Sequence, residues 1–482
     1  MMMFQPSITH HFETLLASQK TSSQHALPFM PWQTQLLQRI TQAPRLPMLG
    51  QVSRVVGLTL EVQGLSGALG DVCKVHAHVP HDVALTSPSS SVAPSEVLLE
   101  VVGIKEHTLQ LMPLGDLPSV AQGASVYNTH EPFKVPVGMS LLGRVLDGLG
   151  NPIDDKGPLY PEAYMPVQTS KPPHPLKRRE ISEVFHTGVR AIDAFLTMGY
   201  GQRIGLFAGS GVGKSTLLGM LAKESSADIN VIALVGERGR EVREFVEQAL
   251  GSEGMKRSVL VVATSEQSPL SKMKSALVAT AIAEYFRDVQ GKHVLLMMDS
   301  LTRVAMAMRE VGLSIGEPPA MKGYTPSMFA FMPKLVERAG YGEQGSITAL
   351  YTVLVEGDDL NEPVADTVRG LLDGHFVLSR ALADKNHFPA LDVGASVSRL
   401  FHTLTSPEHR AMAGKVRDWM ATYKNAEDLI SLGAYTAGSN PSLDVAIAKQ
   451  DWIGEFLRQP LDQYATWETT WHFLKKLAQD PS

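Results

Sequence analysis

The part of the chain from about residue 200 to residue 380 alternates apolar runs with longer segments of helical spacing. The apolar runs are residues 204–208, 231–235, 259–263, 294–298, 347–355 and 376–378. The segments with helical spacing are residues 214–224, 240–250, 273–289, 302–311 and 363–371. Strands without a polar face belong to a sheet buried on both sides, and parallel strands need helical crossovers. The alternation therefore predicts an α/β fold with a mostly parallel sheet covered by helices on both faces.

One junction between a strand and a helix in this region has the sequence of a phosphate-binding loop. The segment is Ala208-Gly209-Ser210-Gly211-Val212-Gly213-Lys214-Ser215. It departs from the pattern G-x-x-x-x-G-K-[ST] only at Ala208, where the pattern has glycine. The alternative, a glycine-rich turn with an incidental lysine, is disfavoured because a strand precedes the loop and a helix follows it.

The residue types of this loop suit the chemistry of a bound nucleotide. Its glycines let backbone N–H groups surround phosphate oxygens, and the helix N-terminus favours negative charge. Lys214 is expected to reach the outer phosphates, and the Ser215 hydroxyl to bind Mg²⁺. The residues expected to contact the nucleotide are Gly209, Ser210, Gly211, Val212, Gly213, Lys214, Ser215 and Thr216.

Two other apolar runs are followed by a carboxylate. Asp299 ends the run 294–298, as in a Walker B element, and is expected to hold Mg²⁺ through its water shell. Glu237 follows the run 231–235, and open α/β sheets bind ligands at the carboxyl ends of their strands. We therefore expect Glu237 to polarise the water that attacks the γ-phosphate. The alternatives are a helix-capping aspartate and a solvated acid in a charged turn.

The flanking regions have different patterns. Between about residues 50 and 128, short β-rich runs with glycine turns predict a small all-β barrel or sandwich. The runs are residues 52–56, 58–62, 73–78, 97–102 and 108–112, and a Ser/Pro-rich loop, residues 86–95, is inserted between two of them. Residues from about 400 onward have helical spacing and predict a helical domain. The first 47 residues are either a partner-binding arm or a disordered terminus. The expected divisions are therefore 1–47, 48–130, 131–400 and 401–482.

Composition excludes several classes of protein. Lys and Arg total 43 against 49 for Asp and Glu, so a net charge of -6 gives no overall attraction to nucleic acid or anionic lipid. A single cysteine excludes an internal disulfide and a cysteine-based zinc site. No apolar run reaches the 18 residues that span a bilayer, and the start lacks the signature of a signal peptide. We therefore expect a cytoplasmic protein.

Beyond these motifs, the core resembles the catalytic subunits of the rotary ATPase superfamily. The run from Pro389 to Ser398, followed by Arg399, is similar to the signature decapeptide of that superfamily and the arginine after it. Further stretches are similar to the flagellar and type III secretion export ATPases. These stretches are residues 142–150, 187–193, 201–205, 316–319, 322–324 and 345–349 continuing to Arg380. The similarity extends over roughly residues 48 to 460.

The resemblance implies a RecA-like P-loop ATPase core with an N-terminal all-β barrel and a C-terminal helical domain. It implies that Glu237 is the catalytic carboxylate, with Arg238 beside it, and that Arg399 is an arginine finger reaching the site of a neighbouring subunit. Phe388 falls on an aromatic that stacks on adenine. Trp467 or Tyr464 is a candidate for the other side of that pocket, but packing in the core of the helical domain is the favoured explanation for both.

The resemblance also implies a function and partners. The chain is expected to form a homohexamer with ATP and Mg²⁺ between subunits, and to drive protein export through a flagellar or type III secretion apparatus. Its expected partners are stator-like and central-stalk-like proteins, export substrates and chaperones. No binding of nucleic acid is expected. The chain is expected to reach the inner-membrane export gate only through its partners. The alternatives are a non-catalytic nucleotide-binding subunit of a rotary ATPase, and a hexameric RNA translocase.

Overall fold

A computed structural model describes residues 48–76, 96–115, 120–168, 172–174, 176, 178–355, 362–461 and 463–479. The expected arm 1–47 and the Ser/Pro-rich loop 86–95 lie outside the described residues. No helix among the described residues is long and apolar enough to cross a membrane.

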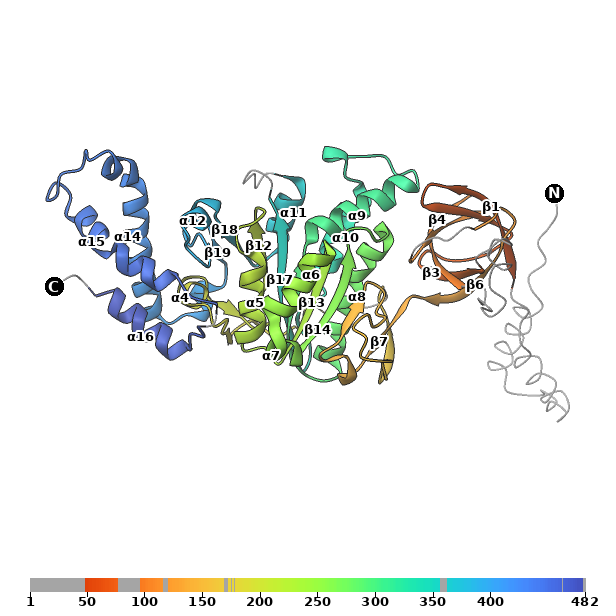
Figure 1. The fold of residues 1–482 in the computed structure, drawn as a ribbon, viewed down its shortest axis with the longest axis horizontal. Coiled ribbons are helices and arrows are strands. Elements are labelled where there is room, and N and C mark those ends of the chain that lie inside the picture. Colours follow the sequence, from red (N-terminus) through yellow and green to blue (C-terminus); the bar gives the residue numbers. More distant parts are fainter. Residues whose placement is uncertain are drawn as a thin grey trace, which may run out of the picture. The chain divides into compact units, whose positions relative to one another are not determined.

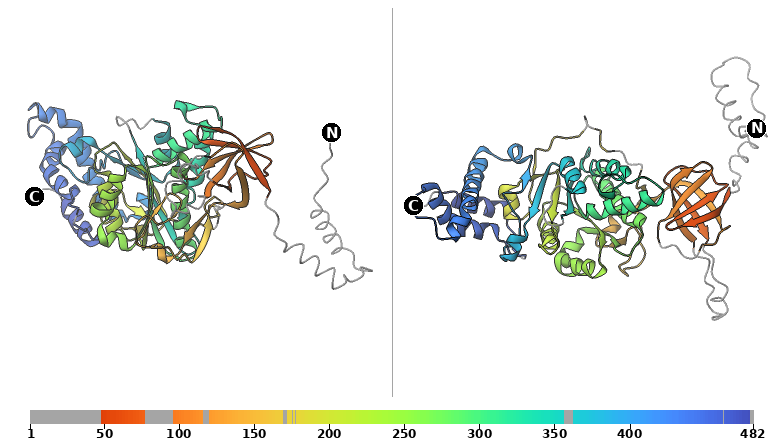
Figure 2. Two further views of the ribbon diagram at one scale, coloured as in Figure 1. Left: turned by 45° about the vertical axis from the view of Figure 1, so that its right-hand side comes forward. Right: turned by 90° about the horizontal axis from the view of Figure 1, so that it is seen from above.

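The first six strands close into a barrel. They are β1 (Leu49–Val56), β2 (Thr59–Gln63), β3 (Asp71–His76), β4 (Glu96–Lys105), β5 (Thr108–Pro113) and β6 (Ser125–Pro132), hydrogen-bonded in the order β1-β2-β5-β4-β3-β6. The closed barrel is seen in Figure 2. Side chains that alternate along its strands, among them Val52, Leu60 and Leu99, fill the interior. The predicted barrel is confirmed, and β6 is a strand that is not among the predicted runs.

A mixed sheet forms the centre of the molecule, and its strand order is β19-β18-β12-β17-β15-β13-β14-β8, with β16 paired to β17 (Figure 1). Its strands are β8 (Val145–Asp147), β12 (Arg203–Ala208), β13 (Ile229–Glu237), β14 (Ser258–Thr264), β15 (His293–Asp299), β16 (Gly340–Tyr341), β17 (Ser346–Leu354), β18 (Gly374–Leu378) and β19 (Val397–Ser398). All neighbours pair parallel except β16 and β19. All six apolar runs are strands of this sheet.

Helices cover both faces of the sheet. They are α5 (Lys214–Glu224), α6 (Gly239–Glu244), the π-helical turn η2 (Phe245–Leu250), α7 (Gly251–Lys256), α8 (Pro269–Asp288), α9 (Leu301–Ser314), the short η3 (Met321–Gly323), α10 (Pro326–Val336), α11 (Pro363–Leu371) and α12 (Arg380–Asp384). Successive residues of β13 show the two faces: Val231 and Ala233 pack in the core with α8 to α11, whereas Ile232 packs in the core with α5. The predicted α/β core is confirmed.

Short elements connect the barrel, the sheet and the C-terminal region. They are β7 (Lys134–Val137), which pairs with β9 (Ala163–Pro166), η1 (Met139–Leu141), β10 (Val184–Phe185), which pairs with β11 (Met198–Gly199), and α4 (Arg190–Phe195). A buried ion pair links the barrel to the core, because Lys274 Nζ on α8 lies 2.5 Å from Glu100 Oε2 on β4. The Ser271 hydroxyl of α8 also donates to the Leu114 carbonyl just after β5.

The last described region is helical, as predicted. Its helices are α13 (Phe401–Leu404), α14 (Pro407–Ser431), α15 (Pro441–Leu457) and α16 (Trp467–Leu477). The three longer helices each begin after a residue whose side chain caps the first turn: Ser406, Asn440 and Thr466. Their apolar residues share a core with α4 and α5. The divisions at residues 130 and 400 stay predictions.

Candidate active site

The predicted site residues lie at the carboxyl ends of three strands, at one edge of the sheet. The P-loop follows β12, Glu237 ends β13 and Asp299 ends β15. The strand β17 lies between β12 and β15, with Ala208 opposite Leu354, and β13 lies on the far side of β15, with Leu234 opposite Asp299. Because these strands are parallel, their carboxyl ends open at the same edge of the sheet.

The P-loop has the backbone conformation that its glycines allow. Gly211 and Gly213 have φ values of 77° and 88°, in the left-handed region that favours glycine. Gly213 precedes α5 without a side-chain cap, so the first N–H groups of the helix are open to an anionic ligand. Within the loop and first turn, Val212 is buried, Gly209, Gly213, Lys214 and Thr216 are half-buried, and Ser210, Gly211 and Ser215 are exposed.

Lys214 and the two predicted carboxylates meet in one network. Lys214 Nζ donates to Asp299 Oδ1 at 2.6 Å and to Glu237 Oε1 at 3.3 Å. The side chain of Asp299 is 4% exposed, those of Lys214 and Glu237 14% and 16%. A buried carboxylate is costly unless it is paired, so the ammonium group stabilises both acids in this arrangement.

Burial and neighbouring charges set the protonation of this network. Burial raises the pKa of Glu237 to about 7, opposed by the charge of Lys214 and supported by that of Asp299 and by a hydrogen bond to Glu241. For Lys214, burial lowers the pKa, but the charges of Asp299 and Glu237 outweigh it and raise the pKa above its usual value. Lys214 is therefore charged at neutral pH, whereas the pKa of Glu237 lies close to neutral pH.

The oxygen donors at the end of the P-loop fit Mg²⁺. Ser215 provides a hydroxyl at the start of α5, and Asp299 provides a carboxylate at the end of β15. The described residues contain no group of three or more His, Cys, Asp or Glu side chains that could hold a metal ion. Mg²⁺ at nucleotide sites is held by one or two side chains together with phosphates and water, and the Ser215 hydroxyl and the Asp299 carboxylate match this pattern.

Phe388 lies against the P-loop. A Cβ atom added to Gly213 would lie 3.2 Å from Phe388 Cδ1, so the aromatic ring directly borders the start of α5. The two other aromatic candidates have neighbours elsewhere. Trp467 stacks on Trp471 at 5.7 Å between ring centroids and packs against His409, whereas the Tyr464 ring lies beside Gly188.

The two predicted arginines lie outside this network. Arg238 is exposed and precedes α6. Arg399 follows β19 and is also exposed. Its N–H donates to the Asp373 carbonyl just before β18, and its Nη2 donates to the Arg369 carbonyl near the end of α11. Since β18 and β12 are parallel, Arg399 lies at the amino edge of the sheet, opposite the P-loop.

Two contacts of the site were not found from the sequence. The Thr352 hydroxyl donates to Asp299 Oδ1 at 2.7 Å, and Arg380 Nη2 donates to the Ser210 carbonyl of the P-loop at 3.0 Å. Thr352 is one polar residue in an apolar strand and gives no signal of its role. Arg380 ends the last stretch that is similar to the export ATPases, but no role was assigned to it, and its contact with the P-loop follows from the pairing of β18 with β12.

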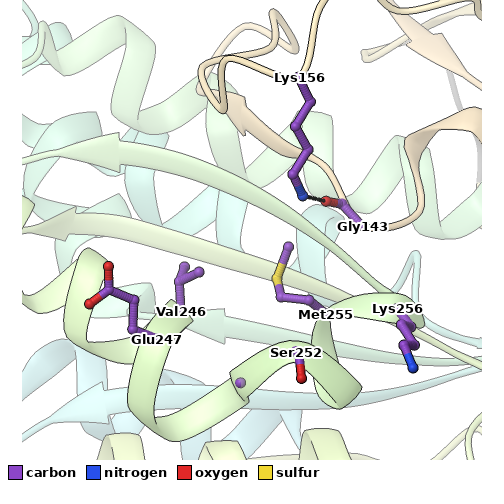
Figure 3. A pocket seen from close by; sticks show the side chains of 8 residues that line it. Gly143, Lys156, Val246, Glu247, Ser252, Met255 and Lys256 are labelled. Carbon is purple, nitrogen blue, oxygen red and sulfur yellow. Dashed lines mark hydrogen bonds between the residues drawn. The ribbon is translucent and has the colours of Figure 1, made fainter.

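A separate surface pocket of about 440 Å³ contains none of the predicted site residues (Figure 3). It is lined by Gly143, Lys156, Val246, Glu247, Gly251, Ser252, Met255 and Lys256. Lys156 Nζ donates to the Gly143 carbonyl at its border. The pocket lies beside η2 and α7 and is not part of the candidate active site. That site is identified instead by the P-loop backbone and by the side chains of Lys214, Glu237 and Asp299.

Comparisons with known proteins show the family of the chain. Residues 188–398 match the nucleotide-binding domain of the ATP synthase alpha/beta family, and residues 405–476 match the T3SS EscN ATPase C-terminal domain. The chain is 53% identical over 420 residues to the flagellum-specific ATP synthase of Bacillus subtilis, covering 87% of this chain and 92% of the relative. It is 48% identical over 431 residues to the type 3 secretion system ATPase of Xanthomonas euvesicatoria, covering 89% and 94%.

A solved structure is similar over the same extent. The assembled ATPase EscN from the type III secretion system of enteropathogenic E. coli, solved in complex with its central stalk EscO, has a TM-score of 0.80 and 44% identity. The match covers 89% of this chain and 100% of that chain. The chain belongs to the ATP synthase alpha/beta family and, within it, is an ATPase of flagellar and type III protein export.

Proposed function

We propose that the chain hydrolyses ATP by in-line attack of a water molecule that Glu237 orients and deprotonates. The observation that carries this mechanism is the Lys214–Asp299–Glu237 network beside an open helix N-terminus. ATP binding would draw Lys214 toward the phosphates, because its ammonium is the mobile cation at the end of the P-loop. Glu237 would then lose its partner and be free to hydrogen-bond to the attacking water.

Each residue of the site has one proposed task. The P-loop N–H groups and Lys214 bind the phosphates, and Phe388 stacks on the base. Ser215 and Asp299 would hold Mg²⁺, which supplies positive charge to the phosphate oxygens when bound. Arg238, next to Glu237 and exposed, is proposed to contribute charge on the same side of the site. Fixed charges of this kind stabilise the transition state more than the ground state.

Arg399 is proposed to act on the site of a neighbouring subunit. It lies at the amino edge of the sheet, whereas the P-loop begins after the carboxyl end of β12, which has six residues. Six strand residues span about 20 Å, more than an arginine side chain can reach. Arg399 is therefore too far from the P-loop of its own chain to act there, and we propose that it acts on the P-loop of a second copy.

This requirement supports a ring of identical subunits, and we propose a homohexamer. EscN, which is similar over its whole length, was solved in assembled form with a central stalk. We propose by analogy that this chain contacts a central-stalk-like protein, together with stator-like proteins, chaperones and export substrates. It would be cytoplasmic and reach the inner-membrane export gate only through such partners. No role in nucleic-acid binding is proposed.

Measurement of mass and of ATP turnover on the same samples tests this proposal. We expect turnover per chain to rise with protein concentration in parallel with the fraction of chains in rings, because an isolated chain lacks a finger. The mass is measured with and without ATP and Mg²⁺ at each concentration. Full turnover per chain at concentrations where only monomers are present would contradict a site shared between subunits.

A further inference from the structure

Thr352 is a buried polar residue at the carboxyl edge of the sheet, where the candidate active site lies. It lies near the carboxyl end of β17, the strand between the P-loop strand β12 and the Asp299 strand β15, and its exposed fraction is 0%. A buried hydroxyl is retained at little cost only if it is hydrogen-bonded. The acceptor to which the Thr352 hydroxyl donates therefore indicates the role of this residue.

The Thr352 hydroxyl has two acceptors within reach and one proton to donate. Asp299 Oδ1 lies 2.7 Å from Oγ1, and the Met298 carbonyl oxygen lies 3.3 Å away. The shorter contact is to the charged group, and hydrogen bonds to an ionised acceptor are both shorter and stronger than neutral ones. Thr352 thus donates to the carboxylate.

Both described hydrogen bonds to the Asp299 side chain end on the same oxygen. Lys214 Nζ donates to Oδ1 at 2.6 Å, and the Thr352 hydroxyl donates to it at 2.7 Å. When a nucleotide draws Lys214 to its phosphates, one of these two donors leaves. The Thr352 hydroxyl cannot follow, because it is carried by a strand in the middle of the sheet.

We propose that Thr352 is a positioning residue that fixes the Asp299 carboxylate by its Oδ1 atom, so that Oδ2 is presented to the water shell of Mg²⁺. This inference rests on the proposed function, in which Asp299 holds the metal. Without the hydroxyl, the carboxylate would rotate about its last bond after Lys214 leaves. Mg²⁺ would then bind more weakly, while nucleotide binding without metal would be unchanged.

The test compares Thr352→Val, which keeps the shape and loses the hydroxyl, with Thr352→Ser, which keeps the hydroxyl. The control is Thr348→Val on the same strand. Thr348 is also buried and lies four residues earlier, so it is on the same face, but its hydroxyl accepts from the N–H of Gly201. Thr348→Val should lose stability as Thr352→Val does, without affecting the metal.

The readout is the affinity for a fluorescent ATP analogue in excess Mg²⁺ and in EDTA, together with the melting temperature. The ratio of the two affinities measures the coupling of metal to nucleotide. We expect Thr352→Val to reduce this ratio about tenfold, the size of one hydrogen bond to a charged group, and Thr352→Ser and Thr348→Val to keep it. The affinity in EDTA should be unchanged in all three variants.

Asp299→Asn separates failure of this inference from failure of the proposed function. If Asp299→Asn lowers the ratio and Thr352→Val does not, Thr352 is not a positioning residue and the inference is overturned. If Asp299→Asn leaves the ratio unchanged, the assignment of the metal to Asp299 is itself wrong. An equal reduction in Thr352→Val and Thr348→Val would mean that a general loss of stability, and not the hydroxyl, causes the effect.

Discussion

The two edges of the central sheet are built in different ways. At the carboxyl edge, Lys214, Glu237 and Asp299 are largely buried and bonded to one another. At the amino edge, Arg399 is exposed, and the one described hydrogen bond of its guanidinium is to the Arg369 carbonyl. An exposed arginine held by one carbonyl contributes little to the stability of its own chain.

This difference indicates which parts of the site are complete in one chain. In the proposed mechanism the carboxyl edge of one chain is sufficient to bind a nucleotide, because Lys214, Glu237 and Asp299 lie together beside the P-loop. At the amino edge, Arg399 carries a positive charge. None of the described ion pairs joins it to a carboxylate of its own chain. Substitutions at the two edges should therefore separate nucleotide binding and folding from turnover.

Arg399→Ala is expected to give the largest effect. Turnover should fall by about 10³-fold or more, as for arginine fingers in other phosphoryl-transfer enzymes. Nucleotide affinity of the monomer and the melting temperature should be unchanged, since the side chain is exposed and distant from the P-loop. Steady-state kinetics and equilibrium binding check this. A monomer that binds ATP less tightly after the substitution would place Arg399 at its own site.

Glu237→Gln should reduce turnover by about 10²- to 10⁴-fold and retain ATP binding, because the amide cannot accept the proton of water. Since burial raises the pKa of Glu237 to about 7, the wild-type rate should increase as the pH rises through 7 and the carboxylate ionises. The residual rate of Glu237→Gln should lack this increase. Substantial hydrolysis by the variant would contradict the assignment.

Glu241→Gln provides the matched control for the pH profile. Its carboxyl helps to raise the pKa of Glu237, so its replacement should shift the rising limb to lower pH while turnover at high pH is retained. An unshifted limb would mean that another group controls the pH dependence.

Phe388→Ala should have a smaller effect on ATP turnover than Arg399→Ala or Glu237→Gln. Loss of stacking on the base should raise KM for ATP by about tenfold or more and leave kcat nearly unchanged, since base stacking contributes about 1–3 kcal/mol. Phe388→Tyr keeps an aromatic ring and should restore KM. Measurement of kcat and KM separately checks this, and an unchanged KM in Phe388→Ala would remove the residue from the site.

The fold was largely predictable because its strands carry an unambiguous pattern. The central residues of β12, β13, β14 and β15, which are the runs 204–208, 231–235, 259–263 and 294–298, are all apolar and buried. Runs of this kind between helical segments are typical of a parallel sheet covered on both faces. The helix expected at 240–250 is instead the short α6 followed by the π-helical turn η2. The strand β6 was missed because its sequence, SVYNTHEP, is mostly polar, and its partners in the barrel come from distant segments.

The site was predictable to the extent that its residues belong to contiguous motifs. Lys214 ends the P-loop motif and Asp299 ends an apolar strand, and in the structure Lys214 Nζ lies 2.6 Å from Asp299 Oδ1. Thr352 and Arg380 could not be found in this way, because their contacts depend on which strands are neighbours in the sheet. The position of Arg399 at the opposite edge could not be predicted either, because it depends on the antiparallel pairing of β18 with β19.

The central claim is that a complete site needs two chains, and mixing two inactive variants tests it most directly. Lys214→Ala subunits lack a working P-loop but carry Arg399, whereas Arg399→Ala subunits have an intact P-loop and no finger. Each variant alone should be nearly inactive. We predict that the mixture, with mixed rings verified by mass, hydrolyses ATP well above the sum of its two components. Mixed rings with no more activity than that sum would contradict the claim.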